Sequence, residues 1–177
     1  MKLFAPLSAG LAAALLVSSC GMVPTPPVAL PDVTLDLQPS AAAQGRVVYV
    51  RQDAFGGASV PGILQGLSLS GTAGYTATGG DLGQVGVYVR TSLDTLPGTC
   101  IASTPLVVVC EASGETAQAA GTLTLAAGQG RSFTLSGPAL DAAGKAGHGY
   151  FGVRAVQGNS LAGEKLRLTE LKARARL

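Results

Sequence analysis

The sequence predicts an all-β domain, an antiparallel two-sheet β-sandwich of which a jelly roll is one form. From Gly45 onward, apolar and polar residues alternate with a period of two, which is typical of strands with one buried and one solvated face. Turn signals interrupt these runs at 79–81, 96–98, 128–130 and 158–159. Eight or nine short strands with this spacing favour two packed sheets.

A Pro- and Ala-rich segment, 20–44, precedes the domain, and we expect it to act as an extended spacer. Within it, the alternation at 33–37 predicts a first edge strand. The sandwich domain is expected over 45–177. In its 84–91 strand, the valines should face the core and Tyr88 should face outward. The strands predicted for this domain are 46–51, 62–78, 84–91, 106–111, 121–126, 132–136, 149–156 and 165–177.

The last predicted strand, 165–177, carries apolar residues of both parities. Leu166 and Leu168 share one parity, whereas the apolar residues from Leu171 onward share the other. A regular strand cannot bury both sets on one face. A bulge at 169–170 would restore a single buried face. A short helix from Leu168 is the alternative, but no capping residue supports it.

The first 19 residues have the layout of a secretory signal peptide. Lys2 is followed by an uncharged apolar stretch from Leu7 to Val17 and then by small residues. This stretch is shorter than the roughly 20 residues that a membrane-spanning helix requires. A buried core helix would need a polar face, which the stretch lacks. We therefore expect residues 1–19 to be removed on export.

Val17-Ser18-Ser19-Cys20 resembles the lipobox of bacterial lipoproteins, an aliphatic residue and two small residues before a cysteine. The resemblance implies cleavage before Cys20, a diacylglycerol on its thiol, and acylation of the new amino terminus by a fatty acid such as palmitate. Two or more chains give a lasting anchor. It also implies a place in the cell envelope, with Gly21 favouring the outer membrane, since aspartate there marks inner-membrane retention in many bacteria. The alternative is an ordinary secreted protein with a spare thiol.

Composition limits the function classes. Without residues 1–19, the chain has 158 residues with 11 basic and 10 acidic side chains, enough for one domain with a core. This balance does not favour a nucleic-acid partner. In an oxidising compartment, Cys100 and Cys110 are an even pair, so we predict a structural disulfide between two strand ends joined by a turn at 103–105. Two thiols alone make neither a metal site nor a CxxC redox motif.

No catalytic constellation emerges from the residue types. His148 is the one histidine, in a Gly-rich turn, and no serine occupies a nucleophile-elbow pattern. The carboxylates are scattered without a calcium-loop pattern. We therefore expect no enzyme and no cofactor. Tyr75, Tyr88 and Tyr150 are candidates for stacking on sugar rings, although half-buried packing is the commoner role of such tyrosines.

Basic residues crowd the last predicted strand. On an edge strand they would prevent sheet-to-sheet aggregation. The alternative is a basic stripe that meets anionic lipid heads or an envelope polymer. The five residues are Lys165, Arg167, Lys172, Arg174 and Arg176.

The function that these observations favour is that of a lipid-anchored envelope protein acting by contact, as a structural or accessory subunit. Its expected partners are the membrane, through the lipid, and an envelope protein. The alternative is a module that binds glycan or another envelope polymer.

Overall fold

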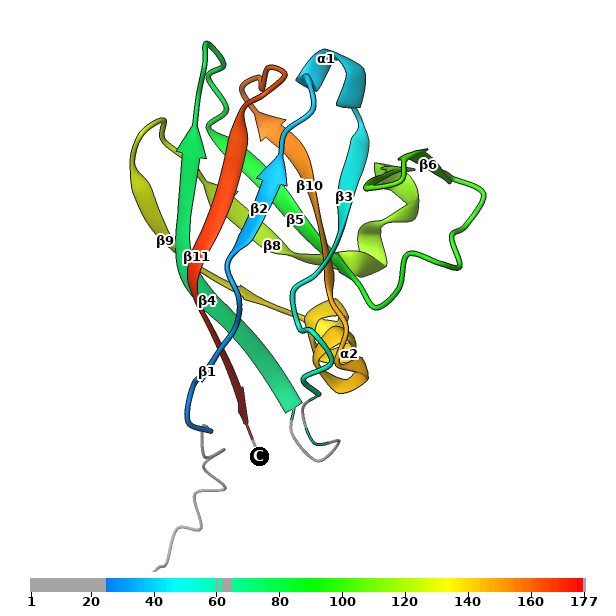
Figure 1. Ribbon diagram of the computed structural model, residues 1–177, viewed down its shortest axis with the longest axis vertical. Coiled ribbons are helices and arrows are strands. Elements are labelled where there is room, and N and C mark those ends of the chain that lie inside the picture. The colour runs from blue at the N-terminus through cyan, green and yellow to red at the C-terminus, as the bar shows by residue number, and fades with distance from the viewer. Residues whose placement is uncertain (1–24, 60, 62–64, 177) are drawn as a thin grey trace, which may run out of the picture.

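The computed structural model describes residues 25–59, 61 and 65–176. They form two antiparallel sheets with an apolar core between them (Figure 1). This arrangement confirms the predicted all-β two-sheet sandwich. The leader and Cys20 lie outside the described residues.

Sheet A has five strands in the order β1-β11-β4-β9, with β2 also pairing with β11. The short strands β1 and β2 follow each other along the same side of β11. β11 is therefore an internal strand, so the interpretation of its basic residues as edge protection is wrong. The strands are β1 (Val28–Ala29), β2 (Val33–Asp36), β4 (Gln65–Thr76), β9 (Gly130–Ser136) and β11 (Lys165–Arg176).

Sheet B has six strands in the order β6-β7-β3-β10-β5-β8. β6 and β7 are the hairpin that brings the two cysteines together, and its turn lies at 105–106. The strands are β3 (Arg46–Asp53), β5 (Gln84–Arg90), β6 (Cys100–Thr104), β7 (Val107–Glu111), β8 (Ala119–Thr124) and β10 (Tyr150–Gln157). Two turns of 3₁₀ helix, η1 (Ala112–Gly114) and η2 (Thr116–Gln118), connect β7 to β8.

Most of the predicted spacer 20–44 is folded. Residues 25–43 belong to the sandwich, because they form β1, β2 and the short helix α1 (Ser40–Ala43). Val33 and Leu35 are buried in the core, as the alternation at 33–37 predicts. The expected domain boundary at residue 45 is therefore wrong, because the folded domain already includes Thr25.

The core has two parts. The larger one lies between the sheets and includes the three valines of β5, as predicted. A second cluster lies on the opposite face of sheet B and contains Tyr49, Tyr88, Leu93, Val108 and Cys110. Tyr88 was expected to face outward, but it is buried because the β5–β6 connection, with Leu93, and η1 cover this face.

Helix α2 (Pro138–Ala146) was not predicted from the sequence. Pro138 occupies its first turn and Gly147 ends it in the left-handed conformation, with φ 74°, which are common start and stop features. Leu140 and Ala143 are fully buried in the main core. The helix therefore contributes to the core at the end of the sandwich where β9 passes to β10.

β11 contains the bulge that its parity change predicts. Leu166, Leu168 and Leu171 are all buried, and the register with β4 shifts between Thr169 and Lys172. Glu170, within the bulge, has a φ of 54°, in the left-handed region. The extra residue lets one face of β11 stay apolar on both sides of the bulge. The helical alternative is wrong.

Gly71 of β4 lies opposite the bulge, where a Cβ would be only 2.7 Å from the Thr169 carbonyl oxygen. We expect Gly71→Ala to lower the free energy of unfolding by about 1–3 kcal/mol, because backbone must shift. Gly74→Ala, on the same strand with nothing within 4 Å of the added Cβ, is the matched control. Urea titrations followed by circular dichroism measure both. Equal stability of the two variants would contradict the tight approach at the bulge.

Candidate functional site

The disulfide between Cys100 and Cys110 is formed, as predicted, and it joins directly paired positions of β6 and β7. The bridge spans 10 positions of the chain. In the chain-entropy estimate a loop of this size stabilises the fold by roughly 3 kcal/mol. The hairpin at the edge of sheet B is therefore held covalently.

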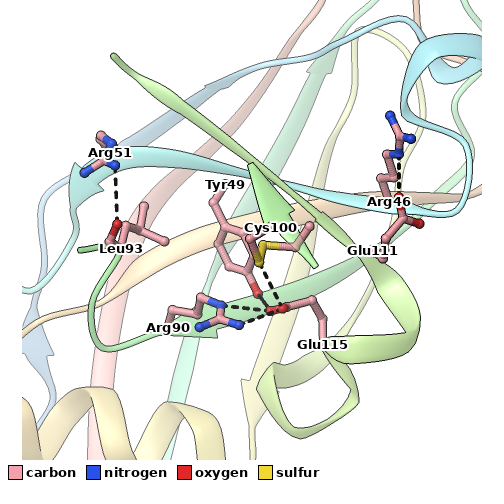
Figure 2. The surroundings of a disulfide bond; sticks show 9 residues. Arg46, Tyr49, Arg51, Arg90, Leu93, Cys100, Glu111 and Glu115 are labelled. Atoms are coloured by element: carbon pink, nitrogen blue, oxygen red, sulfur yellow. Dashed lines mark hydrogen bonds and ion pairs between the residues drawn. A yellow bond between two sulfur atoms is a disulfide. The ribbon is translucent and has the colours of Figure 1, made fainter. Parts of the chain in front are cut away.

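A buried carboxylate lies beside the disulfide (Figure 2). Glu115, between η1 and η2, is fully buried. It accepts hydrogen bonds from Arg90 Nε at 2.9 Å and Nη2 at 2.7 Å, and from the Tyr49 hydroxyl at 2.6 Å. Its Oε1 is also 3.7 Å from Cys100 Sγ. The bidentate pair with Arg90 attaches the η1–η2 segment to β5, and the Tyr49 hydrogen bond attaches it to β3.

Burial and the Glu115 hydrogen bond raise the pKa of Tyr49 far above its ordinary value. The hydrogen bonds to Glu115 raise the pKa of Arg90, against the opposing effect of burial. Arg90 also lies over the Tyr49 ring, 5.7 Å from its centroid. Cys100, Cys110 and Glu115 place their potential metal-ligand atoms within 4.8 Å of one another. However, the two sulfurs are bonded to each other and the carboxylate is paired with Arg90. The cluster thus braces the hairpin.

The hairpin also carries exposed apolar side chains. Ile101 is 61% exposed and Leu106, in the turn, is 71% exposed. On the face that β6 and β7 share with Ile101, partly exposed Val107 and Val109 line a shallow hollow of about 160 Å³ beside α1. β6 is the end strand of sheet B and lies to the side of the molecule, away from β9 and β11 (Figure 1). We call Ile101, Leu106, Val107 and Val109 the hairpin surface.

The three tyrosines considered for sugar stacking do not come together. Tyr75 lies in the main core and is 2% exposed, whereas Tyr88 and half-buried Tyr150 belong to the second cluster. The rings of Tyr75 and Tyr88 are therefore buried, and no exposed tyrosine in the described part of the chain lies beside Tyr150. This placement does not favour the glycan-binding alternative.

His148 lies beside Asp53, with 2.7 Å between Nδ1 and Oδ2. Burial opposes ionisation of Asp53, but hydrogen bonds from the Gly149 and Phe55 backbone and from His148 lower its pKa. The carboxylate thus fixes the turn that leads into β10. We assign the His148 side chain, which is 53% exposed, no further role.

Glu164 is a second fully buried carboxylate, at the opposite end of sheet A from β1. It accepts hydrogen bonds from the backbone N–H groups of Thr78, Gly80 and Leu161, and from the Tyr75 hydroxyl. Burial alone would raise its pKa, but these bonds lower the pKa to about 2. Burial and Glu164 raise the pKa of Tyr75 to about 12. The carboxylate holds together the β4–β5 and β10–β11 connections.

Fold and site together define a disulfide-braced antiparallel β-sandwich. No family of known proteins, no curated protein sequence and no solved structure gives a match to this chain. In the part of the chain that the structure describes, no helix is long and apolar enough to cross a membrane.

Proposed function

We propose that this protein is exported, cleaved before Cys20, and held by lipid on Cys20 at a membrane of the cell envelope. There it acts by contact, as a structural or accessory subunit without catalysis. The proposal of an anchor is supported by the lipobox-like residues 17–20 and by the apolar leader before them. The outer membrane is the favoured location because glycine, and not aspartate, follows Cys20.

The observation that carries the contact role is the hairpin surface. Ile101 in β6 and Leu106 in the adjoining turn are the two most exposed large apolar side chains among the described residues. Together with Val107 and Val109 they form one apolar surface, and a contiguous exposed apolar patch is a feature of interaction sites. The hairpin is braced by the disulfide and by Glu115, so it loses little conformational freedom on binding. Among the described strands, β6 is an end strand of sheet B and pairs with β7 alone. An extended segment of an envelope protein fits this combination, because it adds a strand and covers the apolar residues.

The anchor is tested by mass spectrometry and cell fractionation. We expect native protein to begin at Cys20 with fatty acids attached, and Cys20→Ser to move the protein from the membrane fraction to the soluble fraction. A retained leader, or an unmodified Cys20, would overturn the anchoring proposal.

The contact role is tested by placing a photo-crosslinking amino acid at position 101 of the lipidated protein in intact cells. We expect one protein partner to be crosslinked in stoichiometric amounts, and Ile101→Asp to reduce its co-purification at least tenfold. Val156, on β10 and 49% exposed, provides the matched control, Val156→Asp. Absence of a partner, or equal loss in the two variants, would argue against the hairpin surface.

A further inference from the structure

The described chain begins close to the proposed anchor and at one end of the sandwich. The Thr25 backbone N–H donates to the Ala175 carbonyl at 2.9 Å, and the Ala175 N–H donates to the Thr25 hydroxyl at 3.0 Å. Thr25 is five residues after Cys20, which at full extension spans at most about 18 Å. A lipid on Cys20 would therefore keep this end of β11 next to the bilayer.

The same end of β11 carries three basic side chains. Lys172, Arg174 and Arg176 are exposed and alternate with the buried residues Ala173 and Ala175. Among the described residues none of the three forms an ion pair, whereas Lys165 at the other end of the strand lies 3.4 Å from Asp36. Because β11 is an internal strand, protection of a sheet edge does not explain these charges.

An apolar groove opens at this end too. It has a volume of about 320 Å³, within the usual range for small-molecule sites of roughly 300–1,000 Å³. Val28, at its rim, is 58% exposed. Other residues that line the groove are Leu30, Phe55, Leu67, Ala173 and Ala175. Strands β1 and β11 thus present an apolar groove on one side and positive charge on the other. Figure 1 shows this part of the two strands at the end of the molecule opposite α1.

We propose that this end of the sandwich is a docking surface for the anionic phospholipid of the membrane that holds the anchor. Lys172, Arg174 and Arg176 contact the headgroup phosphates, and the groove behind Val28 receives an acyl chain of the same leaflet. The charges match an anionic surface, and the short connection to Cys20 brings the surface to it. The proposal rests on the anchoring in the proposed function and fixes the orientation of the anchored domain, with α1 away from the bilayer.

The test uses the chain from residue 20 with Cys20→Ser, so that binding does not depend on attached lipid. Its probe is vesicles of phosphatidylethanolamine and phosphatidylglycerol, compared with vesicles of phosphatidylcholine alone, in a co-sedimentation assay. We expect salt-sensitive binding to the anionic vesicles only. Each basic residue at such a surface contributes about 1 kcal/mol, or roughly fivefold in affinity. Lys172→Gln/Arg174→Gln/Arg176→Gln should therefore weaken binding about 100-fold.

The matched control is Lys165→Gln/Arg167→Gln/Arg131→Gln, which removes one lysine and two arginines from the other half of sheet A. We expect it to weaken binding less than fivefold. Val28→Asp should weaken binding at least tenfold, and Val156→Asp, on β10, should leave it unchanged. Equal loss in the two triple variants, or no binding to anionic vesicles, would overturn the docking surface. Neither outcome bears on the proposed lipid at Cys20, which mass spectrometry tests separately.

Discussion

Replacing Glu115 by alanine is expected to lower the free energy of unfolding by about 3–5 kcal/mol, the usual cost of breaking a buried ion pair from one side. The Arg90 side chain is only 13% exposed, so without Glu115 its charge stays buried with no carboxylate partner. Tyr49 loses the acceptor of its hydroxyl at the same time. Urea unfolding followed by circular dichroism measures the loss, since the chain has no tryptophan.

The same region contains a matched control, which Figure 2 also shows. Arg46 and Glu111 form a second arginine–glutamate pair, at 3.0 Å, but their side chains are 44% and 51% exposed. Water screens such a pair, so Glu111→Ala should cost only about 0–1 kcal/mol. Comparable losses in Glu115→Ala and Glu111→Ala would contradict the role of burial.

A triple replacement distinguishes the net contribution of the buried cluster to stability from the cost of removing only one of its partners. Tyr49→Phe/Arg90→Met/Glu115→Leu removes all three polar partners, so no charge or hydroxyl remains buried without a partner. Because apolar replacement of a buried ion pair is often neutral or stabilising, we expect this variant to be more stable than Glu115→Ala. A triple variant at least as unstable as the single one would show that the cluster itself stabilises the fold.

The fold was predictable from the sequence where side-chain alternation alone decides the structure. Most strands of both sheets, the disulfide, and the bulge at 169–170 follow from parity or from cysteine count. Helix α2 was missed because its short apolar stripe, Leu140 and Ala143, lies in an alanine- and glycine-rich segment without strong periodicity. Strand β1 was missed because its pairing with β11 is long-range and prolines surround it.

The candidate site was much less predictable. The burial of Tyr88 depends on a second core on the far face of sheet B, which is created by the paths of the β5–β6 connection and of η1. Arg90 and Glu115 lie 25 positions apart, and no spacing in the sequence marks them as partners. For the same reason nothing in the sequence distinguishes buried Glu164 from exposed Glu170. Long-range pairing of polar residues has no local period to reveal it.

Glu164→Gln is expected to lower the free energy of unfolding by about 2–4 kcal/mol, because an amide provides one acceptor where the carboxylate provides two. Glu164 Oε1 accepts from the backbone of Thr78 and Gly80, and Oε2 from Leu161. In any orientation the new NH₂ group faces a backbone donor, and each buried donor left without an acceptor costs about 1–3 kcal/mol. Glu170→Gln, at an exposed position of β11, should change stability by less than about 0.5 kcal/mol.

The dependence of stability on acid pH provides a second, independent test of the role of Glu164. Its pKa is about 2 in the folded protein against an ordinary value of 4.5. A lowered folded pKa contributes stability that is complete above pH 4.5 and is lost as the pH falls toward 2. We therefore expect the wild-type protein and Glu170→Gln to lose stability across this window, and Glu164→Gln to lose clearly less. Asp53, whose pKa is also lowered, accounts for a remaining slope. Parallel curves for Glu164→Gln and wild type, measured by urea unfolding at each pH, would show that Glu164 is not the ionised acceptor between the two connections.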